Sequence, residues 1–450
     1  MWIKVKWWCL VWLLLPAVAG ASESYPRLAN YYLSFFTPAD YQSLARWDLL
    51  IVQPEMARSQ APFFAYYRAR QPAGKLLAYL YPAMFFRETI FYDQLSWRRR
   101  IFDQINAAAW WLRDEQGKVV EAWPNLAVVD LTNEEWRRFN INYLNDNFLL
   151  SERWDGLMYD LVDAEVSYYS KSGIDLNKDG QAENAAAVNE RWQAAMAKLL
   201  RESRQLWPDK IILINGNSAA RYQPSVNGRM FENFPTSWEG NGSWADSMRQ
   251  YLTRLPGLNQ PPAVYVLNAT YRPAEARDRY QQMRFGLTSA MLGDGYFSFD
   301  SGEASHSQQW WFDEYNLDLG RSLSAPYNLL SDDRAVRAGL WRRDFAKGIV
   351  LVNSTNRPQT VIFQEEKFKR LAGVQEPLVN DGQPVKRLVL CPADGIILLR
   401  ATTPQPILDG DWLRCQAPRP AKTASWETAL KNYLNRFMMK WRLWQAYYFN

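Results

Sequence analysis

Three carboxylates end short apolar runs of this 450-residue chain, and residues of this kind can carry acid–base chemistry. Asp160 ends WDGLMYD, Glu232 lies in NGRMFENFP, and Asp300 ends GYFSFD. In a barrel of parallel strands, a side chain at the carboxyl end of a strand points into the mouth, where active sites form. Paired carboxylates at this place predict glycoside hydrolysis, which needs one acid and one nucleophile or base.

The local sequence predicts different roles for two of these residues. Glu232 is flanked by apolar residues, so desolvation is expected to raise its pKa and suit it to general acid catalysis. Asp160 precedes Asp163, and two acids near one strand end can have their pKa values pushed apart, so that one stays ionised as a nucleophile. Structural roles are the alternatives: a capping or supporting aspartate for Asp160, and a salt bridge to a barrel arginine for Glu232.

Other polar residues end predicted strands. They are candidate ligands for sugar hydroxyls, with a structural role open for each: Asp163, Asn215, Asn268, Asp300, Glu55 and Tyr81. His306, in a serine-rich loop, is the single histidine of the chain; it either donates a hydrogen bond to substrate or is an incidental loop residue. One imidazole excludes a multi-histidine zinc site and leaves a Ser-His-Asp triad only this residue. Carboxylate chemistry, which requires no cofactor, is what remains.

Short apolar strands alternate with helical stretches between residues 27 and 302, which predicts a (β/α)8 TIM barrel. Nine strand candidates compete for eight places, so we assign 125–131 to an excursion before a helix over 133–149. The segment 154–163 then becomes the fourth barrel strand. Further helices are expected over 184–206 and 274–292. The other strand candidates are 27–35, 47–55, 75–82, 210–218, 228–235, 261–271 and 295–301.

The pattern divides the chain into four parts. Residues 1–21 have the charged start and short apolar stretch of a signal peptide, which predicts export to the periplasm or the exterior. The barrel is assigned to 22–330. Strands separated by turns follow, and they predict a small antiparallel, sandwich-like β domain over 331–416. A basic amphipathic helix is expected over 417–450.

The net charge bears on the kind of partner, and the cysteines bear on a possible disulfide. The net charge of +5 is too small to indicate a nucleic-acid partner. Cys9 would leave with the signal peptide, so Cys391 and Cys415 are left either to pair in an oxidising compartment or to stay as buried thiols.

The last segment carries an apolar stripe beside basic residues. The stripe can dock on the barrel or on a partner protein, or it can lie on an anionic membrane surface. We favour docking, because apolar helical stripes are more often buried than exposed. The stripe consists of Trp426, Leu430, Tyr433, Phe437, Trp441 and Trp444.

One segment matches the oxygen-ligand spacing of a calcium loop, with Gly180 at the sixth position. Ala186 stands at the twelfth position, where a bidentate glutamate belongs. The sequence therefore predicts either a weak structural calcium site or a metal-free turn. The candidate ligands are Asp175, Asn177, Asp179, Gln181 and Glu183.

Several of these motifs together resemble a known family. WDGLMYDLVD, ILINGNS, RMFENFP and FSFDSG, followed by KGIVLVNST and DGIILL, are similar to bacterial barrel glycoside hydrolases related to family 114, the polygalactosaminidase-like enzymes. The resemblance spans about residues 27–400 and is most specific in the fourth-strand and sixth-strand motifs. It implies that Asp160 and Glu232 are the catalytic pair of a retaining enzyme. The long insertion after Asp163 and the last helix depart from the family, so the sugar is not carried over.

These observations predict an exported glycoside hydrolase that acts on a microbial polysaccharide. A non-catalytic polysaccharide-binding protein on the same barrel scaffold is the competing interpretation. The separation of the two carboxyl groups distinguishes them, because an enzyme needs both groups at one cleft.

Overall fold

The computed structural model describes residues 24–87, 96–149, 152–217, 219–275, 277–303 and 305–401. The predicted signal peptide, Cys415 and the predicted C-terminal helix lie outside these residues. No helix among the described residues is long and apolar enough to cross a membrane.

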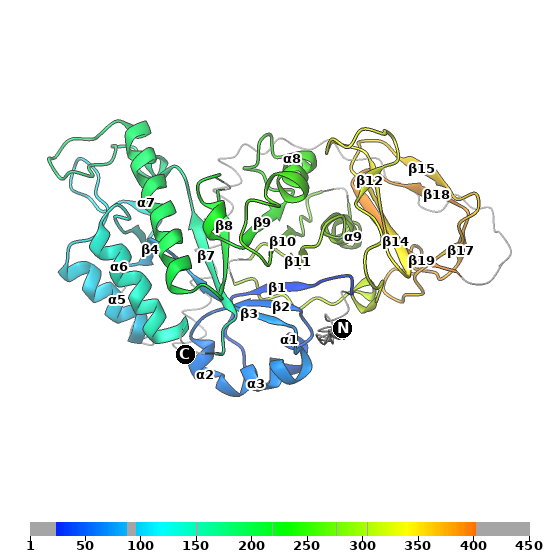
Figure 1. Ribbon diagram of the computed structural model, residues 1–450, viewed down its shortest axis with the longest axis horizontal. Helices are drawn as coiled ribbons and strands as arrows, with labels where there is room; N and C mark the ends of the chain where they lie inside the picture. The colour runs from blue at the N-terminus through cyan, green and yellow to red at the C-terminus, as the bar shows by residue number, and fades with distance from the viewer. Residues whose placement is uncertain are drawn as a thin grey trace, which may run out of the picture.

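Eight parallel strands form one sheet in the order β1-β2-β3-β7-β8-β9-β10-β11 (Figure 1). A parallel bridge between Leu28 and Phe297 connects the chain at the start of β1 to β11 and closes the sheet into a barrel. The predicted TIM barrel is therefore confirmed. Its strands are β1 (Ala29–Tyr32), β2 (Leu49–Val52), β3 (Lys75–Leu80), β7 (Gly156–Val162), β8 (Ile211–Gly216), β9 (Gly228–Phe234), β10 (Val266–Thr270) and β11 (Tyr296–Asp300).

Helices between these strands surround the barrel. The predicted helix over 184–206 is confirmed as α7 (Ala185–Leu206). It begins after Asn184, because the side chain of Asn184 accepts hydrogen bonds from backbone N–H groups of the first turn. The helix predicted over 274–292 starts later, as α9 (Arg279–Ala290), where Asp278 caps it. The others are α1 (Tyr41–Leu44), α2 (Met56–Ser59), α3 (Ala61–Arg70), α5 (Ser96–Ala107), α6 (Glu134–Leu144) with a π-helical end at Asn145–Leu149, and α8 (Trp244–Arg249).

Two connections depart from a regular barrel. Between β3 and β7 the chain forms a small antiparallel sheet of β4 (Met84–Phe86), β6 (Leu126–Val128) and β5 (Glu121–Trp123). This confirms that 125–131 is an excursion and that β7 is the fourth barrel strand. The crossover from β8 to β9 contains the short 3-10 helix Gln223–Ser225.

A β domain follows the barrel. Its first strand, β12 (Tyr327–Asn328), pairs with β13, so this domain begins slightly before the predicted boundary at 331. Helix α9 packs between the barrel and strands β14 and β19 (Figure 1). Cys391 is disulfide-bonded. Its pairing with Cys415, one of the two alternatives that the sequence left open, stays a prediction. The larger sheet contains β12, β13 (Leu340–Asp344), β14 (Gly348–Asn353), β19 (Asp394–Arg400), β16 (Phe368–Arg370) and β17 (Pro384–Val385), and the smaller one β15 (Gln359–Ile362) and β18 (Arg387–Leu390).

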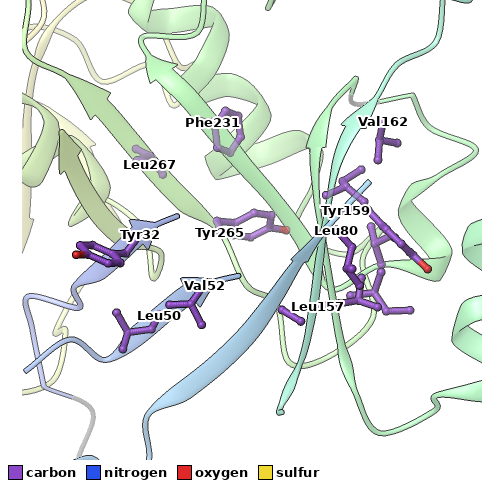
Figure 2. Close-up of a cluster of buried hydrophobic side chains, with 14 of the residues drawn as sticks. Tyr32, Leu50, Val52, Leu80, Leu157, Tyr159, Val162, Phe231, Tyr265 and Leu267 are labelled. Carbon is purple, nitrogen blue, oxygen red and sulfur yellow. The ribbon is translucent and has the colours of Figure 1, made fainter. Parts of the chain in front are cut away.

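The barrel strands bury both faces, as expected for parallel strands. One face joins a large core with the helices, and Figure 2 shows its members Leu50, Val52, Leu157 and Tyr159. The other face forms a separate cluster of strand residues inside the barrel, including Leu77, Met158, Leu213, Met230 and Val266. Because side chains alternate along a strand, the residues that follow by two positions also face the inside.

Candidate active site

The alternation along each strand places polar side chains directly above the apolar layer inside the barrel. In β7, β9 and β10, interior Met158, Met230 and Val266 are each followed two positions later by a polar residue. The interior positions toward the carboxyl ends are Tyr31, Tyr79, Tyr81, Asp160, Asn215, Glu232, Asn268, Ser298 and Asp300. The mouth of the barrel, where active sites of this fold lie, is therefore lined with acids, amides and tyrosines.

Asp160 and Glu232 lie together, joined by one amide group. The Nδ2 of Asn215, on the strand between theirs, donates to Asp160 Oδ1 and to Glu232 Oε2, at 2.9 Å each. An amide NH2 has two hydrogens, so one side chain satisfies both acceptors. Asp160 and Asn215 are buried, and Glu232 is half-buried. The two residues predicted as the catalytic pair are thus brought to one point.

A bulge follows each of these two carboxylates. Leu161 and Asn233, the next residues along the chain, have φ values of 57° and 55°. The pairing register shifts at the same places, between β7 and β8 and between β9 and β10. A bulge re-aims a side chain at the end of a strand, and a left-handed conformation at leucine is uncommon. The backbone therefore departs from regular strand geometry directly after each of the two carboxylate residues.

Asp160 has more hydrogen-bond donors than Glu232. Besides Asn215, its carboxylate accepts from the backbone N–H of Leu161 at 2.8 Å and from the hydroxyl of Tyr79 at 2.5 Å. The Tyr79 hydroxyl is also hydrogen-bonded to that of Tyr81, at 2.9 Å. Donors of this kind stabilise the ionised form of a carboxylate.

Burial, charge and hydrogen bonds act differently on the pKa values of the two carboxyl groups. Burial raises the pKa of Glu232 to about 7, and the charge of Asp160 adds to this increase. Burial also raises the pKa of Asp160, but the hydrogen bonds from Tyr79, Leu161 and Asn215 oppose it. Two carboxyl groups this close cannot easily ionise together, and the pKa of about 7 lets Glu232 keep its proton up to the neutral range. Glu232, with the fewer donors, is the better site for that proton.

Asp300 and His306 form a second polar unit beside the pair. The Nδ1 of His306 lies 2.7 Å from Asp300 Oδ2, which also accepts from Asn268 Nδ2 at 2.9 Å. Asn268 is the register partner of Glu232 on the neighbouring strand. His306, Asp300 and Asn268 are all buried. The structure thus brings two predicted residues, Asn268 and Asp300, next to the pair, and it makes His306 part of the site rather than an incidental loop residue.

Asp163 lies at the edge of this group. Burial raises its pKa to about 6, although a hydrogen bond from Tyr169 lowers it. Tyr169 packs against Tyr168, whose side chain is exposed, and it lies near Trp123 of the β4-β6-β5 sheet. Asp163 is thereby connected to a group of aromatic rings.

Glu55 does not join the pair. Its carboxylate accepts hydrogen bonds from Trp97 at 2.9 Å and from Arg98 at 2.6 Å. This buried ion pair is the structural alternative that the sequence left open for such residues. Tyr79 and Tyr31 were missed by the sequence analysis, although the spacing of two between Tyr79 and Tyr81 indicates that they share one face of β3.

The calcium-like segment uses its oxygens within the loop. The two oxygens of Asp175 accept from the backbone N–H of Asp179 at 3.1 Å and of Gly180 at 2.9 Å. Asn177 donates to Asp179, and Asp179 accepts from the backbone of Gln181. Among the described residues, no group of three or more His, Cys, Asp or Glu could hold a metal ion. These contacts are those of a turn, and calcium binding stays a prediction.

The chain resembles known proteins in two ways. A family model described as hypothetical glycosyl hydrolase family 15 matches residues 68–349. Among solved structures, the glycoside hydrolase domain of PelA from Pseudomonas aeruginosa is 15% identical, over 63% of this chain and 97% of that one, with a TM-score of 0.41. The GH36 α-galactosidase AgaA from Geobacillus stearothermophilus is 12% identical, over 85% of this chain and 56% of that one, with a TM-score of 0.46. No curated protein matches the chain.

The barrel and the family match define this protein as a glycoside hydrolase. More particularly, the chain belongs to hypothetical glycosyl hydrolase family 15, whose model matches more than half of it.

Proposed function

We propose that the protein is an exported hydrolase of a microbial polysaccharide, with Asp160 as nucleophile and Glu232 as acid and base. The observation that carries this proposal is the single Asn215 amide that donates to both carboxylates. Each carboxylate oxygen lies 2.9 Å from the same nitrogen, so the two oxygens are at most twice that distance apart. Retaining enzymes hold their carboxyl groups about 5–5.5 Å apart and inverting enzymes about 6.5–9.5 Å. The shared donor therefore favours retention.

The environment of each group supports its role. Glu232 donates its proton to the glycosidic oxygen while ionised Asp160 attacks the anomeric carbon, which forms a covalent glycosyl-enzyme. Glu232, now ionised, then takes a proton from water as that water attacks the same carbon and releases Asp160. Three donors stabilise Asp160 when it leaves, and the pKa of Glu232 near 7 suits both of its tasks.

Exposed aromatic rings support a polymeric substrate. Phe35, Tyr168 and Trp238 follow the carboxyl ends of β1, β7 and β9, and 45%, 64% and 48% of their respective surfaces are exposed. Aromatic faces suit sugar rings, and three of them around one mouth would contact several units of a chain. A non-catalytic binding protein would keep these rings but would not need the joined carboxylates.

The test begins with a screen of the purified protein for release of reducing ends from exported bacterial polysaccharides. Asp160→Asn and Glu232→Gln should each lower kcat by about 10²-fold or more on the substrate found, because each preserves shape and removes one role. The anomeric configuration of the first product, followed by NMR, should equal that of the substrate. Activity within threefold of wild type in either variant would reject that residue, and an inverted product would reject the nucleophilic role of Asp160.

Export and the C-terminal contact belong to the same proposal. The mature protein from producing cells should begin near residue 22, which N-terminal sequencing measures. Truncation at Pro418 should lower the Tm and leave binding to anionic liposomes unchanged, since we propose that the last segment docks on the protein or on a partner. Loss of liposome binding at an unchanged Tm would instead identify a membrane-surface anchor.

A further inference from the structure

The only histidine of the chain is held at the active site from two sides. The Nδ1 of His306 is hydrogen-bonded to Asp300 at 2.7 Å, and the imidazole ring lies against Tyr31, with ring centroids 4.0 Å apart. The residue is buried and has a φ of 42°, a conformation that few residues other than glycine adopt. A fixed ring in a strained backbone is a pattern associated with functional sites.

Asp300 accepts hydrogen bonds at both of its oxygens. Asn268 Nδ2 donates to Oδ2 at 2.9 Å, and the backbone N–H of Gly302 donates to Oδ1 at 2.7 Å. These donors stabilise the ionised carboxylate, so the His306 nitrogen that faces it carries a proton. The other ring nitrogen, Nε2, then decides whether the imidazole is neutral or positively charged.

The surrounding groups favour the charged ring. Asp300 of β11 contacts it, and Glu232 of β9 and Asp160 of β7 lie on other strands of the same mouth. Tyr31 of β1 packs on the ring and Tyr79 of β3 packs on Tyr31, and burial raises the pKa of both tyrosines, which leaves them uncharged. A positive charge beside three clustered carboxyl groups favours their ionised forms, and they in turn favour the charged ring. In the described part of the chain, His306 is the cation that pairs with one of them.

We propose that Asp300 holds His306 as an imidazolium, and that this fixed positive charge keeps one carboxyl of the Asp160–Glu232 pair ionised while the other holds a proton. His306 is thus a positioning residue for the reaction. Its significance rests on the proposed function, because a pair with two protons has no nucleophile and a pair with none has no acid.

The electrostatic balance agrees with this geometry. Burial lowers the pKa of His306, but the charges of Asp300, Glu232 and Asp160 outweigh it, so the pKa is raised overall. In return, His306 lowers the pKa of Glu232 and of Asp160, against the larger effect of burial. Such coupling is reciprocal: a change at Glu232 must appear in the titration of His306.

A single histidine makes this coupling directly measurable without substrate. The protein is produced without a histidine tag and with isotope-labelled histidine, so that its imidazole gives one set of NMR signals. In the wild type, both ring nitrogens should be protonated at pH 7, and the titration midpoint should lie above the ordinary value of about 6.5. Above its pKa of about 7 Glu232 is ionised, so in Glu232→Gln the loss of this negative charge should lower the midpoint by about 1 unit.

Glu55→Gln is the matched control, because it removes another buried carboxylate at a barrel strand end that is paired with Arg98 instead. It should leave the His306 midpoint unchanged. A neutral imidazole in the wild type at pH 6 would overturn the proposal by itself, even if no variant folds. Equal midpoint shifts in Glu55→Gln and Glu232→Gln would overturn the specific coupling. Neither result depends on finding the polysaccharide, so a failure here and a failure of the proposed hydrolysis are separate outcomes.

Discussion

At the scale of single residues, the site depends on how many donors each carboxylate receives. Asp160 accepts from Tyr79, Leu161 and Asn215, whereas among the described residues the Glu232 carboxylate accepts from the Asn215 amide alone. The sequence predicted the two carboxylates, because each ends an apolar run. It could not predict the bridging amide or the Asp300–His306 contact, since both depend on which strands are neighbours and where the loop after β11 returns.

The pKa of Glu232 leads to a prediction about stability. An unfolded glutamate has a pKa of about 4.3, whereas burial raises that of Glu232 to about 7 in the folded protein. Between these values the folded protein holds more protons than the unfolded chain, so its free energy of unfolding falls as the pH rises through this range. Glu232→Gln should remove this pH-dependent loss of stability, because glutamine does not titrate. The variant should therefore be more stable, relative to wild type, at pH 8 than at pH 5.

Denaturant unfolding at the two pH values measures this difference. Glu190→Gln is the control, because Glu190 forms an exposed ion pair with Arg221 on the surface. It should change stability little at either pH. A Glu232→Gln variant whose advantage is equal at pH 5 and pH 8 would show that Glu232 is ionised over the whole range.

At the scale of elements, the sequence predicted the positions of the barrel strands closely, but it predicted the connections between them less well. All eight barrel strands lie within predicted segments, because buried parallel strands leave a strong apolar signal. Helix α9 begins at Arg279 rather than at 274, since the side chain of Asp278 caps it. The bulge at Leu161 left no sequence signal, because leucine is common in regular strands, whereas Asn233 is of a residue type that adopts positive φ values more often than most.

The bulge in β7 requires a close approach by β8. Gly216 follows Asn215 and has a φ of 132°; a Cβ atom there would lie 2.6 Å from the carbonyl oxygen of Val162. Gly216→Ala should therefore push β8 away from β7 and lower the free energy of unfolding by more than about 2 kcal/mol. It should also reduce activity, because Asn215 would move from the carboxylates.

Gly257→Ala separates strain from contact in this experiment. Gly257 has a φ of 88°, and a Cβ atom would have nothing within 4 Å. Its cost should be about 1 kcal/mol, that of a left-handed alanine alone. Equal losses in thermal unfolding of the two variants would contradict a close packing of β8 on the bulge.

The loop of Asp175 to Glu183 gives a prediction on metal binding. Its carboxylate oxygens accept backbone hydrogen bonds, as in a turn. We expect Asp175→Ala to lower stability by about 1–3 kcal/mol, because two backbone N–H groups lose their acceptor. This loss should be the same with calcium and with a chelator. A Tm of the wild type that falls with chelator, and no longer does so in Asp175→Ala, would establish a calcium site.

At the scale of the whole molecule, one buried arginine connects the barrel to the β domain. Arg284 of α9 donates to both oxygens of Asp394, at 3.1 and 3.0 Å, and to Glu376. Arg284 and Asp394 are almost completely buried. Next to this pair, Gly395 approaches α9 so closely that a Cβ atom would lie 1.8 Å from Thr288 Oγ1. The β domain is therefore packed against α9, the helix that connects β10 to β11. Strand β11 in turn ends in Asp300 of the site.

Removing this arginine should weaken both the fold and the site. Arg284→Met leaves Asp394 buried without its partner and should cost about 3–5 kcal/mol of unfolding free energy. Adding Asp394→Asn should restore part of this loss, because the unpaired charge disappears. Arg221→Met, which breaks an exposed ion pair, should cost less than about 1 kcal/mol.

If Arg284→Met unfolds in one transition with a lowered midpoint, the barrel and the β domain form one cooperative unit. Two separate transitions, with the barrel unchanged in stability, would show that the β domain does not support the site.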